Sequence, residues 1–548
     1  MTWRCAAGLA AVWAAGLAAF AAQAQPVAIS VDLGHPIGPN KPIYAWFGYD
    51  EANYTTMPDG MALLAELHDL SPVPVHIRTH HLLSSGDGVA ALKWSSTNVY
   101  SEDAQGRPHY DFRIFDGIFD QFRAAGVTPM VELGFTPQAL ASEPGPYEDH
   151  YPESSLGGSV QSPPKDLGKW QALIQAVVSH LVERYGRATV AGWYFEVWNE
   201  PDIPYWHGTE EQYFALYDRT AAAVRAVLPG ARIGGPATTG PAGASGAKFL
   251  EDFLLHADRS AVPLDFISFH AKGQPSIVDG HVTMGLASEL ADVERGFALI
   301  QRFPRLARLP VILSEADPEG CAACSAKVNP ANAYRNGTLY PAYTDAAYKR
   351  LFELADRYGI DLISMLSWSF EFENRDYFEG FRSLSTNGVD KPILNFFRMA
   401  ALLRGTRVAT GGAARSAAAI IAEGVRSASD VDAFATADGK GAAILLWNYH
   451  DDAGPGPSAP VTVTISGVPA RARLTHYRID DTHSNAYTAW QKMGSPQKPS
   501  PAQLAELKGK AGLQTLEPPR WLTAAAGRVT VETDMPRQSV SLLQLDWE

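Results

Sequence analysis

The chain has 548 residues, of which 46% are hydrophobic, 19% charged and 10% aromatic, a composition that excludes a mainly disordered chain, a coiled coil or a collagen-like fibre. Its 45 Lys and Arg residues against 59 Asp and Glu residues give a net charge of −14, which opposes binding to nucleic acid or to an anionic membrane surface. The length allows two or three domains of about 150 residues each, or one barrel together with an accessory domain.

Residues 1–24 have the pattern of a secretory signal peptide. Arg4 precedes an apolar stretch rich in Ala and Leu, and Ala22-Gln23-Ala24 provides a cleavage motif. The apolar stretch also approaches the length of a retained membrane anchor. We expect cleavage after Ala24 and a secreted or periplasmic chain that does not associate with the membrane afterwards.

Short β-rich segments alternate with helical segments from residue 43 to residue 404, which is the pattern of a parallel α/β fold. The eight strand candidates are 43–50, 73–80, 127–135, 192–200, 231–237, 264–270, 310–317 and 362–370. Helices are expected between them, for example over 111–126 and 169–186, where apolar residues recur at spacings of three and four. Eight such units predict a (β/α)8 TIM barrel, whereas a doubly wound sheet would not need eight.

The pattern changes after the barrel. From residue 405 to residue 548, alternating apolar and polar residues are separated by Gly, Pro and Asp turns, as in 442–449, 461–468 and 528–534. This predicts an accessory antiparallel β-sandwich. Residues 25–42, before the first barrel strand, are expected to add an N-terminal strand to that sandwich.

Only two cysteines, Cys321 and Cys324, follow the predicted leader. They resemble half of a zinc site, but the sequence contains no second pair of cysteines to complete it. No thioredoxin-like context surrounds them either. In an oxidising compartment we expect a local disulfide that braces a loop.

Two glutamates stand at the carboxyl ends of predicted strands, where barrel enzymes carry their reacting groups. Glu200 closes the fourth strand and Glu315 nearly closes the seventh. Each alone is compatible with a surface residue or a loop cap. As a pair they are typical of glycoside hydrolysis, in which one carboxyl group protonates the leaving oxygen and the other attacks the anomeric carbon or activates water. A separation of about 5–5.5 Å gives retention of configuration, and about 6.5–9.5 Å gives inversion.

Five segments, in chain order, resemble glycoside hydrolase family 39, whose members include β-xylosidases and α-L-iduronidases. They are RTHHLL (78–83), FEVWNEPD (195–202), LDFISFHAKG (264–273), SEADP (314–318) and HSNAYTAWQKMGSPQ (483–497). The resemblance covers almost the whole chain after the leader. It implies that Glu200 is the acid/base and Glu315 the nucleophile of a retaining enzyme with a covalent glycosyl-enzyme intermediate.

The resemblance also implies a set of substrate contacts. Asn199 would hydrogen-bond the sugar hydroxyl next to the anomeric carbon, unless it caps the following loop. His80 and His270 match positions that face the sugar, although a lone His is more often structural. Arg78 would keep the nucleophile ionised, or would be a structural ion-pair partner. Trp368 would form a platform for the sugar ring, or would be a buried core residue.

Two basic residues bear on the substrate class. Lys272 stands where many β-xylosidases have a tyrosine, and it resembles the α-L-iduronidase branch, in which the matching Lys binds the sugar's carboxylate. Arg382 roughly matches that branch's second basic contact. Alternatively, Lys272 pairs with a neighbouring carboxylate such as Asp317. The segments that follow Glu315 and span 483–497 instead resemble bacterial β-xylosidases.

These observations favour an exo-acting β-xylosidase that releases pentose from xylosides or xylo-oligosaccharides, with an arabinosidase or a uronide hydrolase as alternatives. A secreted carbohydrate-binding protein without activity is a further alternative, but the presence of both glutamates argues against it. A metal-dependent sugar isomerase would need several ligands that converge at the rim of the barrel, and the sequence offers only scattered His residues. The glycosidase chemistry requires no cofactor and no metal, and its partner is an oligosaccharide or another glycoside.

Overall fold

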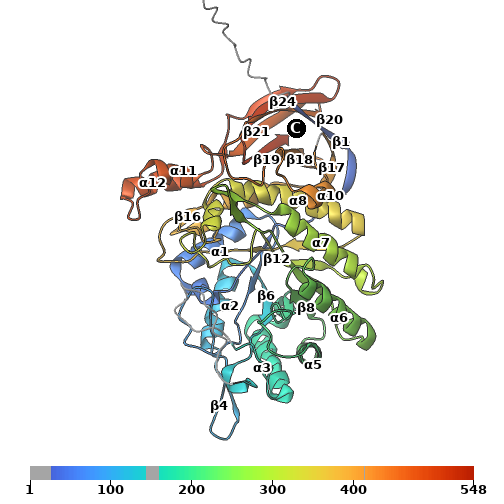
Figure 1. Cartoon of the computed structure of the whole chain (residues 1–548), viewed down its shortest axis with the longest axis vertical. Coiled ribbons are helices and arrows are strands. Elements are labelled where there is room, and N and C mark those ends of the chain that lie inside the picture. Colours follow the sequence, from blue (N-terminus) through green and yellow to red (C-terminus); the bar gives the residue numbers. More distant parts are fainter. Residues whose placement is uncertain (1–25, 144–159, 413, 548) are drawn as a thin grey trace, which may run out of the picture.

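The computed structural model describes residues 26–143, 160–412 and 414–547. The predicted leader, residues 1–24, lies outside this part of the chain. The described residues form a barrel and an accessory β-domain that packs against one side of it (Figure 1).

The barrel consists of parallel strands whose order around the sheet follows their order in the sequence. The strands are β2 (Trp46–Tyr49), β3 (His76–Thr79), β6 (Thr128–Leu133), β7 (Tyr194–Val197), β8 (Arg232–Thr238), β9 (Phe266–Lys272), β12 (Val311–Asp317), β13 (Leu362–Met365) and β14 (Ser367–Trp368). β13 pairs with β12, and β14 pairs with β2, so the last segment forms one interrupted strand that closes the barrel. The prediction of a TIM barrel with eight β/α units is therefore confirmed.

Helices cover the outside of the barrel (Figure 1). They are α1 (Pro58–Leu70), α2 (Arg113–Ala125), α3 (Leu167–Tyr185), the short α4 (Arg187–Val190), α5 (Glu210–Val227), α6 (Ala244–Ser260), α7 (Leu286–Ile300), α8 (Leu339–Tyr358) and α9 (Pro392–Ala401). In α2, Phe115, Ile118, Phe119 and Phe122 are buried, because their spacing places them on one face of the helix. In α3, the side chain of Asp166 caps the first turn.

The loops at the carboxyl ends of the barrel strands carry additional small elements. These elements are η1 (Ala52–Thr56), β4 (Tyr100–Glu102), β5 (Pro108–Tyr110), η2 (Gln138–Leu140), β10 (Ser276–Val278), β11 (His281–Thr283), η4 (Pro330–Asn336), β15 (Ser385–Thr386) and β16 (Val389–Asp390). A further 3-10 turn, η3 (Leu306–Arg308), follows α7 on the opposite side. Cys321 and Cys324, in the loop after β12, form a disulfide.

The accessory domain is one curled sheet that is antiparallel except where β1 and β20 pair in parallel. Its strands are β1 (Val27–Pro39), β17 (Thr406–Gly411), β18 (Asp430–Ala437), β19 (Gly441–Tyr449), β20 (Ala459–Ser466), β21 (Arg471–Ile479), β22 (Gln514–Thr515), β23 (Arg520–Thr523), β24 (Arg528–Met535) and β25 (Ser539–Asp546). Side chains from both ends of the sheet, such as Leu474 of β21 and Val531 of β24, share one enclosed core. The short helix α10 (Ala417–Glu423) connects β17 to β18.

The outer face of this sheet packs against α8 of the barrel. Phe434, Leu445 and Trp447 belong to the same buried cluster as the core between the barrel strands and helices. Arg350 of α8 forms buried ion pairs with Asp430 and Asp432 of β18. The two domains therefore share a continuous interface of apolar and charged side chains.

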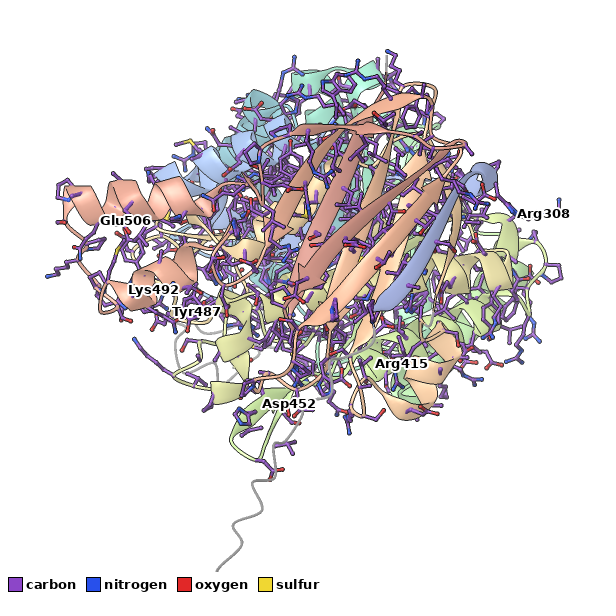
Figure 2. The ribbon with its side chains drawn as sticks, turned by 90° about the horizontal axis from the view of Figure 1, so that it is seen from above. Arg308, Arg415, Asp452, Tyr487, Lys492 and Glu506 are labelled. Atoms are coloured by element: carbon purple, nitrogen blue, oxygen red, sulfur yellow. A yellow bond between two sulfur atoms is a disulfide. The ribbon has the colours of Figure 1, made fainter. Side chains whose placement is uncertain are left out.

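Two further helices, α11 (Ala486–Lys492) and α12 (Pro501–Ala511), form an arm at the side of the accessory domain (Figure 1). Tyr487, Lys492 and Glu506 mark this arm, which extends beyond the sheet (Figure 2). Its Trp490 is buried in one cluster with Phe378 of the loop after β14. Among the described residues, no helix has both the length and the apolar character needed to cross a membrane.

Candidate active site

The two glutamates singled out in the sequence lie close together at the mouth of the barrel. Glu200 follows β7 and Glu315 lies on β12, and one carboxylate oxygen of each lies within 4.8 Å of the other. Nδ1 of His270 lies 2.8 Å from Oε1 of Glu200 and 3.8 Å from Oε2 of Glu315. The side chain of Glu200 is 16% exposed, against 6% for that of Glu315. Glu315 is thus the deeper of the two.

The backbone before and at Glu200 is strained. Trp198 and Glu200 have φ angles of 69° and 46°, in the left-handed region that side chains other than Gly rarely adopt. Such a conformation costs on the order of 1–3 kcal/mol and persists only where the surrounding structure imposes it. Here the N–H of Glu200 donates a hydrogen bond to the carbonyl of Ala237 at the end of β8. This hydrogen bond holds the backbone at Glu200 against the end of β8.

Arg78 lies under the pair and is completely buried. Its guanidinium reaches three carboxylates, at 2.5 Å to Glu196, 3.2 Å to Glu132 and 3.2 Å to Oε1 of Glu315. Burial opposes its charge, but these carboxylates outweigh burial and raise the pKa of Arg78. The same guanidinium donates to Oδ1 of Asn199 at 3.0 Å, which leaves the Asn199 Nδ2 as the donor of that amide.

Lys272 approaches the pair from β9. Its Nζ donates to Oε2 of Glu315 at 2.8 Å and to Oδ2 of Asp317 at 3.1 Å. Burial opposes ionisation of Glu315, but His270, Lys272, Arg78 and His80 hold the pKa of this carboxyl well below its usual range. Glu315 is therefore an anion in the free protein. Lys272 thus contacts Asp317, as one of the two interpretations of the sequence expected, and it contacts Glu315 as well.

A second polar group lies beside Glu315. His80 lies between Asp50, at 2.7 Å from Nδ1, and Glu132, at 2.8 Å from Nε2. Burial disfavours the imidazolium, but the two carboxylates outweigh it and raise the pKa of His80 to about 9. Lys93 also reaches Asp50, at 3.1 Å. Both cations together with His81 hold the pKa of Asp50 well below its usual value despite burial.

Trp368 and Arg382 lie behind the pair and are almost completely buried. Trp368 is 1% exposed, and its indole packs against His80 and over the guanidinium of Arg78. A Cβ at Gly48 would collide with this ring, so the neighbouring strand needs glycine there. Arg382 is 0% exposed and donates to the carbonyl of Trp368 and to Glu319.

Two groups of side chains have the composition of metal ligands within the described residues. They are Asp50 with His80 and His81, and Glu200 with His270 and Glu315. In each group an ammonium already pairs with one carboxylate, Lys93 with Asp50 and Lys272 with Glu315. Because a divalent ion would have to compete with these ammonium groups, neither arrangement favours metal binding.

The structure adds three charged residues to those considered from the sequence. Asp50 and Glu132 contact His80, and Lys93 contacts Asp50. Asp50 ends the first predicted strand as Glu200 ends the fourth, so its position was a usable signal. Lys93 lies in a long irregular loop, where no local pattern indicates its partner.

Comparison with known proteins gives a decisive observation. A family model described as Glycosyl hydrolases family 39 matches residues 77–529. The chain belongs to glycosyl hydrolase family 39. The resemblance proposed from the sequence is confirmed, and the protein is a glycosidase.

Two curated relatives represent two activities of family 39. A β-xylosidase from Geobacillus stearothermophilus is 28% identical over 489 residues, which cover 86% of each chain. An α-L-iduronidase from Mus musculus is 25% identical over 577 residues, which cover 97% of this chain and 83% of the relative. A solved structure of a family 39 enzyme from Xanthomonas axonopodis pv. citri superposes with a TM-score of 0.76 at 24% identity and covers 97% of this chain and 100% of that one. The fold of this family 39 chain is thus shared along almost its whole length.

Proposed function

We propose that this family 39 glycosidase is an exo-acting β-xylosidase that retains the configuration of the anomeric carbon. The observation that carries the proposal is the approach of Glu200 and Glu315 to within 4.8 Å between carboxylate oxygens. This approach is closer than the separation of about 6.5–9.5 Å that leaves room for water in inverting enzymes, and it supports the shorter spacing, about 5–5.5 Å, of retaining ones.

The environments of the two glutamates support different roles. Glu315, kept ionised by its cationic neighbours, is the nucleophile that attacks the anomeric carbon and forms the covalent glycosyl-enzyme. Glu200, the more exposed of the two and hydrogen-bonded to His270, protonates the departing oxygen. In the second step Glu200 takes a proton from water, which attacks the anomeric carbon and releases Glu315.

The proposed mechanism makes Asn199 a substrate ligand. Because Arg78 occupies its Oδ1, the amide presents Nδ2 as a donor next to the carboxylate pair. A hydrogen bond from Nδ2 to the hydroxyl beside the anomeric carbon strengthens as positive charge develops on the sugar. Such a contact stabilises the transition state more than the bound substrate.

A xyloside is the substrate that the observations favour. The β-xylosidase relative has the higher identity of the two relatives reported. A uronide would need Lys272 to bind the carboxylate at its C5 position, whereas a pentose has no such group. The ammonium of Lys272 already donates hydrogen bonds to the carboxylates of Glu315 and Asp317. Glu315 lies deep in the site, with its side chain 6% exposed, and we propose that it acts on the end of a chain.

Hydrolysis of matched aryl glycosides tests the proposal. We expect the protein without residues 1–24 to cleave aryl β-xyloside in preference to aryl α-L-arabinoside, α-L-iduronide and β-glucuronide. The first product observed by NMR should be the β-anomer. Preferential cleavage of a uronide would instead assign Lys272 and Arg382 to the substrate.

Two variants separate the roles in that assay. Glu315→Gln should abolish turnover of every aryl xyloside, by at least about 10³-fold. Glu200→Gln should strongly impair xylosides with poor leaving groups and spare a dinitrophenyl xyloside, which needs no protonation. Glu371→Gln, at a buried glutamate bonded to Ser385 and Gly388, is the matched control and should retain activity. Substantial turnover by Glu315→Gln would refute the nucleophile assignment.

We further propose export through the N-terminal leader. The Cys321–Cys324 disulfide supports an oxidising compartment. The N-terminus of the protein recovered from the periplasm or medium should begin at Gln25. An intact N-terminus at Met1 on an exported protein would instead indicate a retained anchor.

A further inference from the structure

A chain of alternating charges leads from Glu315 away from the sugar site. Its six members, each in contact with the next, are Glu315, Lys272, Asp317, Arg382, Glu319 and Arg335. The outer links measure 3.5 Å from Asp317 to Arg382, 2.6 Å from Arg382 to Glu319 and 2.5 Å from Glu319 to Arg335. The mechanism proposed above uses only the first two members.

The outer half of this chain is largely shielded from solvent. The side chains of Arg382 and Arg335 are 0% exposed, and that of Glu319 is 12% exposed. Burial opposes ionisation of Glu319, but the two guanidinium groups hold its pKa below the ordinary value. Glu319 contacts both arginines, so its loss would remove a compensating carboxylate from two buried positive charges.

The far end of the chain is anchored to the disulfide loop. Arg335 donates to the carbonyls of Cys321 at 2.5 Å, Cys324 at 2.7 Å and Gly380 at 3.0 Å. Asn332 also donates to the carbonyl of Cys324, at 2.9 Å. These bonds fix the loop that carries Glu319 relative to the η4 turn.

The loop that carries Arg382 is anchored separately, by the accessory arm. The side chain of Gln497 bonds both the N–H and the carbonyl of Tyr377. Trp490 packs against Phe378, with ring centroids 5.1 Å apart. The segment 483–497, singled out in the sequence without a chemical role, thus holds the loop from which Arg382 extends.

We propose that Glu319 is a positioning residue for the glycosidase reaction: it holds Arg382 on Asp317, and Asp317 in turn holds the ammonium of Lys272 on the nucleophile Glu315. The inference rests on the proposed role of Glu315. Three groups meet at Asp317, because Lys272, Arg382 and the backbone N–H of Trp368 all contact its carboxylate. With Glu319 in place, Arg382 stays 3.5 Å from Asp317 and helps to fix this carboxylate where Lys272 reaches it at 3.1 Å.

The direction in which the pKa of Glu315 shifts distinguishes a positioning role of Glu319 from the simple loss of its negative charge. The ionisable groups that face Glu315 come from three places in the barrel. They are Arg78 on β3 with His80 directly after it, His270 and Lys272 on β9, and Glu200 after β7. Direct removal of the negative charge of Glu319 would lower the pKa of Glu315, because a distant anion disfavours ionisation. Displacement of Lys272 would raise it. An upward shift therefore reports lost positioning.

The decisive variant is Glu319→Gln, with kcat, KM and the pH profile of kcat/KM measured on aryl β-xyloside. We expect kcat to fall by about tenfold or more while KM changes by less than about threefold, because the interaction acts on the reacting groups. The acid limb of kcat/KM should move to higher pH. An unchanged kcat and an unchanged acid limb in the folded variant would overturn the inference.

Asp430→Asn is the matched control. It removes a buried carboxylate from Arg350 at the domain interface, far along the chain from the site. We expect a comparable loss of stability with an unchanged kcat and acid limb. Equal changes in both variants would mean that Glu319 is merely structural.

Arg335→Lys provides a second variant if Glu319→Gln fails to fold. It keeps the charge but loses the planar fork that bonds the loop carbonyls and Glu319 together. The same upward movement of the acid limb is expected, and its absence would contradict the proposal. Glu315→Gln separates the two hypotheses: if that variant remains active, the proposed function fails, and if it is inactive while Glu319→Gln resembles wild type, only the positioning role fails.

Discussion

The ionisation of each charged residue in this site depends on the oppositely charged residues around it. Arg78 is surrounded by Glu132, Glu196 and Glu315, and His80 by Asp50 and Glu132. In a medium of low polarity such ions persist only in balanced groups. The balance at Glu315 favours the anion, which its proposed role as nucleophile requires, without any change in the residue itself.

Substitution of Lys272 by Met tests this balance. Glu315 is the anion whose pKa the neighbouring cations depress, so loss of the ammonium 2.8 Å away raises that pKa. Lys272→Met should move the acid limb of kcat/KM for aryl β-xyloside upward by about one pH unit. Lys349→Met, at a lysine paired with Asp432 in the domain interface, should leave the profile unchanged. An unchanged profile in Lys272→Met would show that Lys272 does not control the nucleophile.

At the scale of elements, α8 combines a structural and an electrostatic task. It packs on the barrel and on β18 and β19, and its polar residues meet the carboxylates of the accessory sheet. Asp345 is completely buried on this helix, and neither of its oxygens has a hydrogen-bond partner among the described residues. Burial, with Asp432 and Asp430 nearby, raises the pKa of Asp345 well above its ordinary value.

Asp345→Asn should therefore stabilise the protein at neutral pH. The folded state keeps a proton on Asp345 that the unfolded chain releases, so wild-type stability falls as the pH rises above the ordinary carboxyl pKa toward the raised one. An Asn carries no such penalty. Urea unfolding should show the variant gaining about 1 kcal/mol or more relative to wild type between pH 5 and pH 8. If the free energy of unfolding of the variant differed from that of wild type by the same amount at pH 5 and at pH 8, this explanation would be wrong.

At the scale of the molecule, barrel and accessory domain share one core. Leu542 and Trp447 of the accessory sheet lie in the cluster that also contains the residues between the barrel strands and helices. Val463 lies in the separate core enclosed by the curled sheet. The arm of α11 and α12 adds a further contact with the barrel domain, on the loop after β14 (Figure 1).

Because of this shared core, we expect the two domains to unfold together. Loss of activity and loss of the far-UV circular dichroism signal should follow one thermal transition. Leu542→Ala should lower its midpoint for both probes, at a cost of about 2–5 kcal/mol. A first transition that leaves activity intact would show that the accessory domain unfolds independently.

The sequence alone determined the barrel, the accessory sheet and the positions of Glu200 and Glu315, because alternation and strand ends are local patterns. It also indicated a small set of neighbours, including Arg78, Asn199 and His270. It left open whether Lys272 faces a substrate or a carboxylate of its own chain. That question depends on the distance between two neighbouring strands.

Only the tertiary structure decided which charges meet. Arg78 and Glu315 are separated by 237 positions, and Lys41 and Asp361 by 320, yet both pairs are in contact. No pattern of spacing encodes such a pair, because its geometry follows from the order of the strands and the depth of each side chain in the closed barrel. The sequence therefore determined which groups are available for catalysis, and the fold determined their ionisation and their partners, because both depend on burial and on charges brought together from distant segments.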